Sequence, residues 1–408
     1  MIEEGGTASV MSEPFELDLT DMLYGGSALG KQAGRPIFTA YGLPGERVRV
    51  RITEDHGRYA FAVVEQVITS APQRVAPSCP YFAARTCGGC QWQHAAYSAQ
   101  LDYKTSIVRE QFRRIGKFAD PPVRPIIASP DEWYYRTHVT FHSTPDGELG
   151  FVAPQHNRTI TPIHQCTIIR PELLTARETY DGSDEAGHVR FIAGSDGGQV
   201  IATAVSADRD DDSPSTAANG APAQTVTFVV NGATFHVSGG SFFQVNLPQA
   251  ARLVDLVLEQ LDLSGRERVL DLYSGVGLFT AFLAPAAAHV TAIESSPSAV
   301  ADARRNLAHF ANVTIREGLT ERLLPQARGT FDAAVIDPPR AGMKPKALDA
   351  LIARRPRKIA YVSCDPSTLA RDSRILVDHG YSLQYIQPVD MFPQTYHIEC
   401  VAGLERSS

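Results

Sequence analysis

The chain has 408 residues, a formal net charge of −7, 43% hydrophobic residues and 20% charged residues. At roughly 150 residues per domain, this length predicts two or three domains. The composition is typical of a globular protein and excludes a disordered, collagen-like or coiled-coil chain. Because the total charge is negative, any contact with nucleic acid must come from local basic patches.

The sequence carries no signal of a membrane or secretory protein. No stretch reaches the roughly 18 consecutive apolar residues that a membrane-spanning helix requires, and the opening residues MIEEGGTASV have no apolar core of the signal-peptide kind. Six cysteines are too few for a disulfide scaffold, and three of them cluster near residue 90, which favours a metal site. We therefore expect a cytoplasmic protein without a membrane partner.

Residues 13 to about 68 alternate short apolar runs with glycines, which predicts a small antiparallel β-barrel. Successive side chains of a strand point to opposite faces, so the segment ERVRVRI places its arginines on one face and its apolar residues on the other. The arginine face is either an ordinary solvated strand or a ridge that contacts phosphates. This basic ridge comprises Arg47, Arg49 and Arg51.

A basic amphipathic helix is expected over residues 96 to 118. Its apolar stripe lies beside Lys104, Arg109, Arg113, Arg114 and Lys117. Residues 123 to 240 contain strand-like runs separated by turns, which predicts an antiparallel sheet. Within them, residues 207 to 224 are acidic and rich in small residues, and we expect a mobile hairpin insertion without a catalytic role.

From about residue 241 the pattern changes to apolar strands that alternate with helices. This alternation predicts a doubly wound parallel sheet, whose ligands bind at the carboxyl ends of the strands. The expected organisation is a barrel over residues 1–70, a central α+β domain over residues 71–240 and a C-terminal α/β domain over residues 241–408.

The segment RVLDLYSGVGLFT runs from a predicted strand into a glycine turn and a helix. Its glycines Gly275 and Gly277 follow Asp271 in a D-x-x-x-G-x-G form, which resembles motif I of class I S-adenosylmethionine (SAM) methyltransferases. Glu294 closes the next strand, where a carboxylate can accept hydrogen bonds from both ribose hydroxyls. The glycine loop and Glu294 together predict a SAM-binding site.

Two further strand ends carry polar residues. Asp337 begins a rigid Asp-Pro-Pro turn after the fourth strand of this region, and Cys364 closes the strand that follows. Asp365 and Pro366 suit the N-cap and the first position of a helix, and a thiol beside a helix N-terminus can have a lowered pKa. We therefore expect Cys364 to be a nucleophile rather than a buried structural cysteine.

The cysteine cluster has the spacing of a metal site, with the motif C-G-G-C at its centre. The available thiol ligands are Cys79, Cys87, Cys90 and Cys166. His94 and His164 are alternative ligands. Four thiolates bind zinc and a 4Fe-4S cluster equally well, so the spacing leaves the metal open.

Six motifs together carry a resemblance to a known family: CGGC (87–90), SFFQVN (241–246), DLYSGVG (271–277), DPPR (337–340), SCDP (363–366) and HIECVAGLER (397–406). The chain resembles the uracil-5 RNA methyltransferase family over nearly its whole length. The resemblance implies a Rossmann-like class I SAM methyltransferase domain, preceded by a TRAM-type, OB-like β-barrel and a central α+β iron-sulfur domain. The implied enzyme is a SAM-dependent RNA (uracil-5-)-methyltransferase that forms 5-methyluridine.

The resemblance also implies roles for individual residues. Cys364 matches the family's nucleophile and Glu399 its proton-abstracting base. The implied SAM-site and uracil-site residues are Gln244, Tyr273, Gly275, Glu294 and Asp337. The implied cofactors are SAM and a 4Fe-4S cluster on Cys79, Cys87, Cys90 and Cys166.

This sequence departs from the family pattern at two places. Leu278 stands where the family often has asparagine, so we assign no cofactor contact to it. The gap between Cys79 and Cys87 is longer than the family's spacing, which suggests a larger loop. Cys400, next to the base, is expected in the core.

Uracil chemistry explains the implied residue types. Carbon 5 of uracil is too poor a nucleophile to take a methyl group directly, and addition of a thiolate at carbon 6 makes it enolate-like. Gln244 is a candidate to contact the developing charge on the uracil oxygen. After methyl transfer, a carboxylate can remove the carbon 5 proton before the thiolate leaves.

Other functions stay open at this point. A methyltransferase acting on a base nitrogen would place an aromatic residue after the double proline, where this chain has Arg340. A non-catalytic iron-sulfur RNA-binding protein would not need Glu399. The RNA is either 23S ribosomal RNA, which the cysteines favour, or the T-loop of transfer RNA, and we expect a monomer.

Overall fold

Five strands near the N-terminus close into a barrel in the computed structural model, which describes residues 13–154, 159–180, 187–195, 197–205 and 224–406. The strands are β1 (Phe15–Met22), β2 (Ala28–Gln32), β3 (Arg35–Ala40), β4 (Arg47–Asp55) and β5 (Ala60–Thr69), in the order β1-β2-β3-β5-β4. The predicted barrel is confirmed, except that β3 and β5 pair in parallel. Along β4 the valines and Ile52 are buried and the arginines of the basic ridge point outward, as the alternation predicts.

Two helices follow the barrel: α1 (Pro80–Ala83) and α2 (Tyr97–Arg114). The chain forms two compact units, and α2 belongs to both. The first unit contains residues 1–107 with 394–396, and the second contains residues 108–393 with 397–408. The division into three domains stays a prediction.

The second unit begins with the predicted antiparallel sheet, which has the order β10-β9-β6-β7-β8. Its strands are β6 (His138–Ser143), β7 (Leu149–Val152), β8 (Ile160–Pro162), β9 (His188–Ala193) and β10 (Val200–Val205). Helix α3 (Pro171–Glu178) interrupts the strands, and β11 (Thr225–Val230) and β12 (Ala233–Ser238) form a separate hairpin. The hairpin predicted over residues 207–224 lies outside the described residues, apart from its last residue.

A seven-stranded sheet dominates the rest of this unit, in the order β15-β14-β13-β16-β17-β19-β18. Its strands are β13 (Arg268–Leu272), β14 (His289–Glu294), β15 (Val313–Glu317), β16 (Ala333–Ile336), β17 (Lys358–Ser363), β18 (Tyr381–Val389) and β19 (Glu399–Arg406). The first five strands in this order are parallel, whereas β19 pairs antiparallel with both neighbours.

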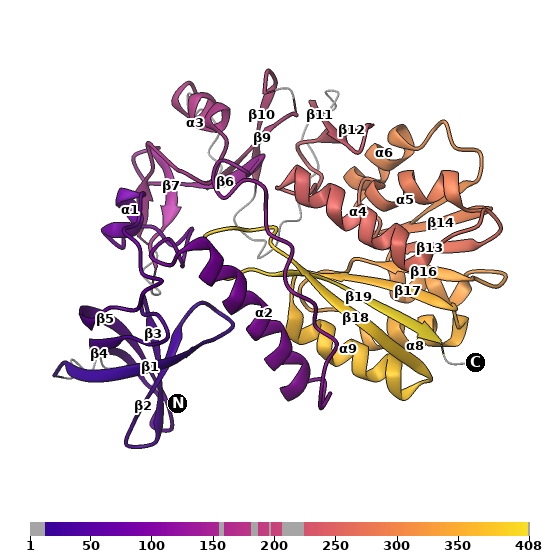
Figure 1. Cartoon of the computed structure of the whole chain (residues 1–408). Coiled ribbons are helices and arrows are strands. Elements are labelled where there is room, and N and C mark those ends of the chain that lie inside the picture. Colours follow the sequence, from indigo (N-terminus) through magenta and orange to yellow (C-terminus); the bar gives the residue numbers. More distant parts are fainter. Residues whose placement is uncertain (1–12, 155–158, 181–186, 196, 206–223, 407–408) are drawn as a thin grey trace, which may run out of the picture. The chain divides into compact units, whose positions relative to one another are not determined.

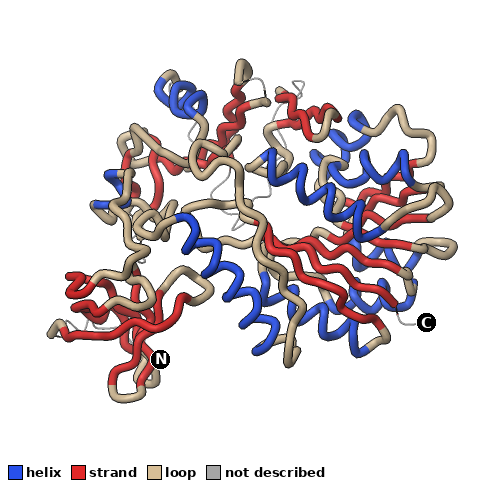
Figure 2. The backbone as a smooth tube through the Cα atoms, viewed as in Figure 1, coloured by secondary structure: helices blue, strands red, loops and turns tan. Residues whose placement is uncertain are grey.

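Helices cover both faces of this sheet, as Figures 1 and 2 show. They are α4 (Leu247–Leu261), α5 (Leu278–Leu283), α6 (Pro297–Asn306), α7 (Thr320–Leu323), α8 (Pro345–Arg354) and α9 (Pro366–Asp378), with short 3-10 turns η1 (Ala284–Ala286) and η2 (Leu324–Gln326). The predicted doubly wound α/β fold is therefore confirmed. Parallel strands end at the same edge, so the loops after β13, β14, β16 and β17 meet there.

None of the helices in the described ranges is long and apolar enough to cross a lipid bilayer.

Candidate active site

Cys364 and Glu399 lie at the ends of neighbouring strands. Ser363 at the end of β17 pairs with Cys400 in the antiparallel β19, so the next step of this register brings Cys364 beside Glu399. Residues opposite each other in an antiparallel pair point to the same face, so the thiol and the carboxyl share one side of the sheet. Glu399 is 3% exposed. The structure thus brings together two residues that are 35 positions apart in the sequence.

The pKa of the Cys364 thiol is raised, so the prediction of a lowered pKa was wrong. Burial raises it most, and the carboxyl groups of Glu399 and Asp337 raise it further. Arg340 acts in the opposite direction but does not outweigh them. The thiol is therefore protonated at neutral pH in the ligand-free protein, and attack on a base requires this proton to leave.

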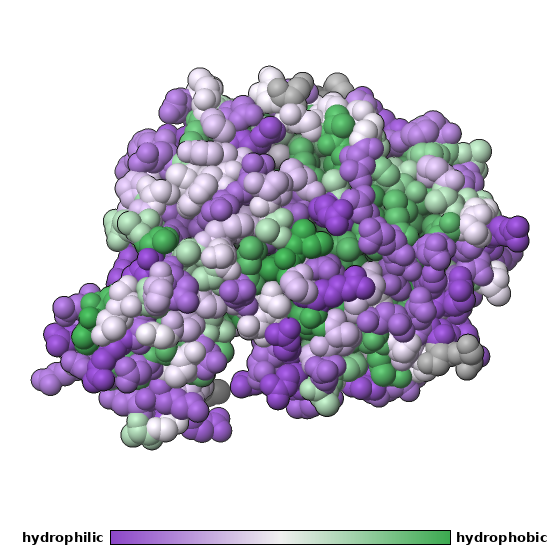
Figure 3. Space-filling view, in the orientation of Figure 1, coloured by the Kyte–Doolittle hydropathy of each residue, from purple (hydrophilic) through white to green (hydrophobic). Residues whose placement is uncertain are grey.

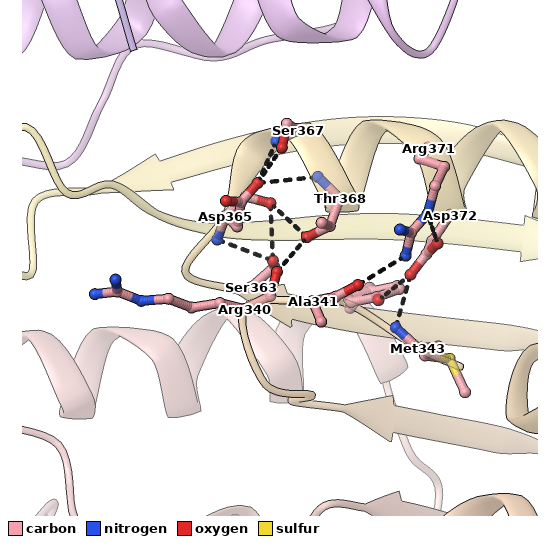
Figure 4. A network of polar contacts seen from close by, with 10 residues as sticks. Arg340, Ala341, Met343, Ser363, Asp365, Ser367, Thr368, Arg371 and Asp372 are labelled. Carbon is pink, nitrogen blue, oxygen red and sulfur yellow. Dashed lines mark hydrogen bonds and ion pairs between the residues drawn. The ribbon is translucent and has the colours of Figure 1, made fainter. Parts of the chain in front are cut away.

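The turn that carries Cys364 is fixed by its neighbours (Figure 4). The carboxyl group of Asp365 caps helix α9 by accepting hydrogen bonds from the backbone N–H groups of Ser367, at 2.8 Å, and Thr368, at 3.0 Å. The Ser363 hydroxyl accepts a hydrogen bond from the Asp365 backbone N–H at 3.2 Å. The predicted cap is confirmed, and it leaves the thiol on a turn with little conformational freedom.

The same network ties the Asp-Pro-Pro-Arg loop to α9. The Thr368 hydroxyl donates to the carbonyl of Arg340 at 3.1 Å, and the Arg371 guanidinium donates to the carbonyl of Ala341 at 3.0 Å. In Figure 4 the side chain of Arg340 extends away from these contacts. The loops after β16 and β17 are therefore one connected structure.

Asp372 is the centre of this network, although no sequence motif indicates it. Its side chain is 1% exposed and accepts hydrogen bonds from the Tyr361 hydroxyl at 2.6 Å and the Met343 backbone N–H at 2.9 Å. It also pairs with Arg371 at 2.8 Å. Gly342 has a φ of +74°, and a Cβ there would lie 2.7 Å from the Asp372 carboxyl, so the loop can approach Asp372 only with glycine at this position.

Glu294 braces the glycine loop that follows β13. Its carboxyl accepts hydrogen bonds from the backbone N–H groups of Gly275 at 2.9 Å, Ser295 at 2.6 Å and Ser296 at 2.7 Å. Tyr273 and Gly275 both have positive φ angles, of 63° and 54°, which turn the chain sharply at the strand end. The predicted spacing therefore places Glu294 against the loop, where its oxygens retain lone pairs for a ligand.

Two buried carboxyl groups lie near this edge of the sheet: Asp271 within β13, and Asp337 directly after the neighbouring strand β16. Burial raises the pKa of Asp337 to about 7, and the negative charges of Asp271 and Glu294 add to the effect. Burial likewise raises the pKa of Asp271 to about 7, although Thr280 donates a hydrogen bond to it at 2.5 Å. The second oxygen of Asp271 has no hydrogen-bond partner among the described residues. These acids make the sheet edge strongly attractive to a cation.

Gln244 lies in the buried loop that leads into α4. Asn246 caps this helix and donates hydrogen bonds to the Ser129 hydroxyl at 3.0 Å and the Met391 carbonyl at 3.3 Å. Phe242, two residues before Gln244, is 41% exposed. Phe242 is not among the residues predicted from the sequence, and its exposed aromatic ring is a surface on which a base can stack.

The four cysteines of the predicted metal site form no disulfide bond. Cys79, Cys87 and Cys90 belong to the first unit and Cys166 to the second. Across the residues that the structure describes, no three His, Cys, Asp or Glu side chains converge to hold a metal ion. The Cys87 sulfur accepts a hydrogen bond from the Gly89 backbone N–H at 3.4 Å. The described side chains therefore do not form a metal site, and the cluster stays a prediction.

The basic ridge of the barrel is largely neutralised. Arg47 pairs with Glu16 at 3.0 Å, and Arg51 pairs with Glu65 at 2.5 Å. Arg49 lies 4.0 Å from Glu16. These pairs favour the solvated-strand interpretation of this face.

One residue of the predicted basic helix, Lys104, does not lie on its basic surface. Lys104 is 0% exposed, and its ammonium group lies 5.8 Å from the centre of the Trp92 ring. It therefore belongs to the core of the first unit and not to a basic surface.

Comparison with known proteins agrees with this geometry. Residues 224–407 match the family model of tRNA (Uracil-5-)-methyltransferase, and residues 16–64 match the TRAM domain. An uncharacterized RNA methyltransferase of Halalkalibacterium halodurans is 35% identical, with 96% of each chain covered. An uncharacterized RNA methyltransferase of Streptomyces avermitilis is 33% identical, over 97% of this chain and 99% of the relative.

A solved structure shares the fold. The Pyrococcus abyssi tRNA (uracil-54, C5)-methyltransferase, in complex with S-adenosyl-L-homocysteine, superposes with a TM-score of 0.70. It is 24% identical, and the match covers 95% of this chain and 100% of that one. Because the relatives that are 33% and 35% identical cover nearly the whole chain, and the family model matches its C-terminal part, the protein belongs to the SAM-dependent RNA uracil-5 methyltransferase family.

Proposed function

We propose that the protein methylates carbon 5 of a uridine in RNA through a covalent cycle on Cys364 and Glu399. The observation that carries the proposal is the strand register that sets this thiol beside this buried carboxyl group. The Cys364 thiol loses its proton to solvent and the sulfur adds to carbon 6 of uracil, and carbon 5 then takes the methyl group of SAM, which leaves as S-adenosylhomocysteine. Glu399 accepts the carbon 5 proton, the electrons of that C–H bond re-form the C5–C6 double bond, and the C6–S bond breaks to release the product and a Cys364 thiolate. The thiolate takes a proton from Glu399, so one turnover releases one proton to solvent.

The surroundings of Glu399 suit a proton acceptor. Burial and the charge of Asp337 raise the pKa of Glu399, while Arg340 lowers it. A carboxylate with a raised pKa binds a proton more strongly than an exposed one, which favours removal of a carbon-bound proton. Phe242 provides an exposed ring on which the uracil stacks, and Gln244 contacts the uracil oxygen.

SAM supplies the methyl group as a sulfonium cation. We assign its binding to the glycine loop with Tyr273 and Gly275, to Glu294 at the ribose hydroxyls, and to Asp337. The buried carboxyl groups at this edge favour a cation over its neutral demethylated product.

Replacement of Glu294 by alanine is expected to weaken SAM binding at least tenfold. The variant loses the acceptor for the ribose hydroxyls, at a cost of about 1.5–3 kcal/mol, and also the brace on the Gly275 backbone N–H. Isothermal titration calorimetry measures the change. Glu317→Ala is the matched control. Glu317 lies opposite Glu294 in the register of the adjacent strand β15, but its side chain is exposed and forms an ion pair with Arg304. Unchanged SAM affinity in Glu294→Ala would place the site elsewhere.

SAM binding is expected to strengthen about tenfold between pH 6 and pH 8. A carboxyl group with a pKa of about 7, such as Asp337, goes from roughly one-tenth to nine-tenths ionised over this range. S-adenosylhomocysteine lacks the sulfonium charge and should respond less. The free energy of unfolding changes in the opposite direction. Because the pKa of Asp337 is higher in the folded protein than in the unfolded chain, the ligand-free protein loses stability as the pH rises from about 4 through 7. Calorimetric titrations over this range test both ligands, and Asp337→Asn should flatten the SAM profile.

We propose 23S ribosomal RNA as the substrate, with the T-loop of transfer RNA as the alternative. The four-cysteine set favours ribosomal RNA, whereas the archaeal neighbour acts on uracil 54 of a tRNA. Mass spectrometry of 5-methyluridine in purified ribosomal and transfer RNA, from a strain with and without the gene, decides between them. Loss of 5-methyluridine from neither RNA would contradict the proposed function.

We also propose that Cys79, Cys87, Cys90 and Cys166 hold one 4Fe-4S cluster. Protein purified without oxygen is expected to contain about four iron atoms per chain and to lose them on Cys87→Ser, whereas Cys400→Ala, at a buried cysteine of the core, should retain them. Metal analysis by plasma mass spectrometry is the measurement. One zinc ion per chain and no iron would overturn the prediction in favour of zinc.

A further inference from the structure

Four aromatic rings gather on the outer face of the barrel, within the first unit. We call them the ring patch: Phe38, His56, Tyr59 and Phe61. Phe38 and Phe61 pair across the parallel strands β3 and β5, with ring centres 5.3 Å apart. His56 stacks on Tyr59 at 4.8 Å, and Tyr59 lies 5.7 Å from Phe38. Each ring touches at least one other, so the patch is continuous.

The ring patch faces solvent. Residues next to it in the sequence, Ile37, Ala60 and Ala62, fill the barrel interior, so alternation turns the rings outward. Phe61 is 37% exposed, and His56 is also exposed. The face of the protein visible in Figure 3 is mainly hydrophilic over the barrel, with small hydrophobic areas. Exposed clustered rings on such a surface indicate a binding site.

The backbone holds the ring patch in place. The turn between β4 and β5 is closed by the His56 backbone N–H, which donates to the Tyr59 carbonyl at 3.0 Å. The Gly57 backbone N–H donates to the Asp55 carboxyl at 2.8 Å, and Arg35 pairs with the same carboxyl. The rings are therefore positioned before a ligand arrives, which lowers the entropy cost of binding.

Two cations lie beside the ring patch, whose His56 ring also lies 3.4 Å from the Glu54 carboxyl. The arginines of the basic ridge lie near carboxyl groups of neighbouring strands. Among the described barrel residues, Lys31 and Arg58 are cations with no carboxylate within ion-pair distance. Arg58 sits in the turn between His56 and Tyr59, and Lys31 lies on the strand that pairs with β3, on the same outer face as Phe38. Both unneutralised cations of the barrel thus flank the rings.

We propose that the ring patch binds unpaired nucleotides of the RNA substrate by base stacking, with Arg58 and Lys31 contacting the adjoining phosphates. Aromatic rings accept any base because every base has a π face, and cations beside them follow the backbone. In a duplex the bases are stacked on each other and cannot reach these rings. The patch therefore selects RNA that carries a single-stranded segment. This proposal rests on the proposed function only in that RNA is the substrate.

The test uses the full chain and a fluorescein-labelled, single-stranded RNA 12-mer, followed by fluorescence anisotropy. Tyr59→Leu combined with Phe61→Leu keeps the apolar volume but removes two rings, and should weaken binding about tenfold or more. Binding of the same 12-mer annealed to its complement should stay within twofold. Arg58→Ala should lower the slope of log affinity against log salt by about 0.7.

Two controls keep the outcome interpretable. Ile68→Ala removes an exposed apolar side chain from the same strand β5, outside the patch, and should leave binding unchanged. Tyr59→Phe keeps the ring and should bind as the parent does. Unchanged single-strand binding in the double leucine variant overturns the proposal. Sedimentation of both proteins gives a second test: a dimer of the parent that becomes a monomer in the double leucine variant would show that the patch binds a second copy of the chain, and this also overturns the proposal. The binding readout does not need methyl transfer, so stacking without 5-methyluridine would refute the proposed function alone.

Discussion

Glu399→Gln is expected to stay covalently attached to its RNA, whereas Cys364→Ala is expected never to attach. The glutamine variant keeps the nucleophile, so it adds to carbon 6 and transfers the methyl group. It then stalls, because the C6–S bond cannot break until the carbon 5 proton has left. Both variants should lose turnover by several orders of magnitude. A denaturing gel after incubation with SAM and substrate RNA should show a slow-migrating band for Glu399→Gln only.

Cys400→Ala is the matched control for this experiment. Cys400 is buried beside Glu399 on the same strand, and alternation turns its side chain to the opposite face of the sheet. This variant should turn over normally and show no stalled band. Full turnover by Cys364→Ala would instead refute covalent catalysis and favour direct methylation of a base nitrogen.

Asp372→Ala is expected to lower the free energy of unfolding by about 3–5 kcal/mol, because it leaves buried donors without their acceptor. The Tyr361 hydroxyl and the Met343 backbone N–H both donate to this carboxyl, and Arg371 pairs with it. The loop that carries Asp337 would also lose one of its attachments to helix α9, the hydrogen bond from the Met343 backbone N–H. We therefore expect activity to fall even at temperatures where the variant is folded.

Urea unfolding followed by circular dichroism measures the stability change. Asp378→Ala is the control on the same helix, because Asp378 forms an exposed pair with Arg374 one turn away, and such pairs contribute at most about 0.5 kcal/mol. Equal stability of the two variants would show that the network around Asp372 does not hold the two loops together.

The main features of the catalytic sheet could be predicted because they are local in the sequence. Each parallel strand is a short apolar run that ends in a polar residue, and this pattern identified Glu294, Asp337 and Cys364 at one edge. The neighbouring position of Glu399 could not be derived in this way, since it depends on an antiparallel strand that inserts beside β17. Only the family resemblance pointed to it.

Three features could not be predicted from the sequence because they depend on tertiary contacts. The pKa of Cys364 rises because the thiol is buried and because the carboxyl groups of Glu399 and Asp337, which come from two other strands, act on it, and these effects outweigh the local helix N-terminus. Lys104 is buried although its neighbours on α2 are exposed arginines, because packing around Trp92 decides its exposure. The ring patch arises from β3, β5 and a turn, so no single segment reveals it.

The position of β19 has a consequence for how the enzyme is made. Although β19 follows β18 in the chain, it lies between β17 and β18 in the sheet. During synthesis β18 therefore has no partner on the sheet until β19 emerges, and a shortened chain that stops before Glu399 exposes the edge of β17. Under the proposed mechanism, such a chain carries the Cys364 thiol that attaches to RNA but lacks Glu399, which release of the product requires. We therefore expect the ability to release product to arise only when the sheet is completed.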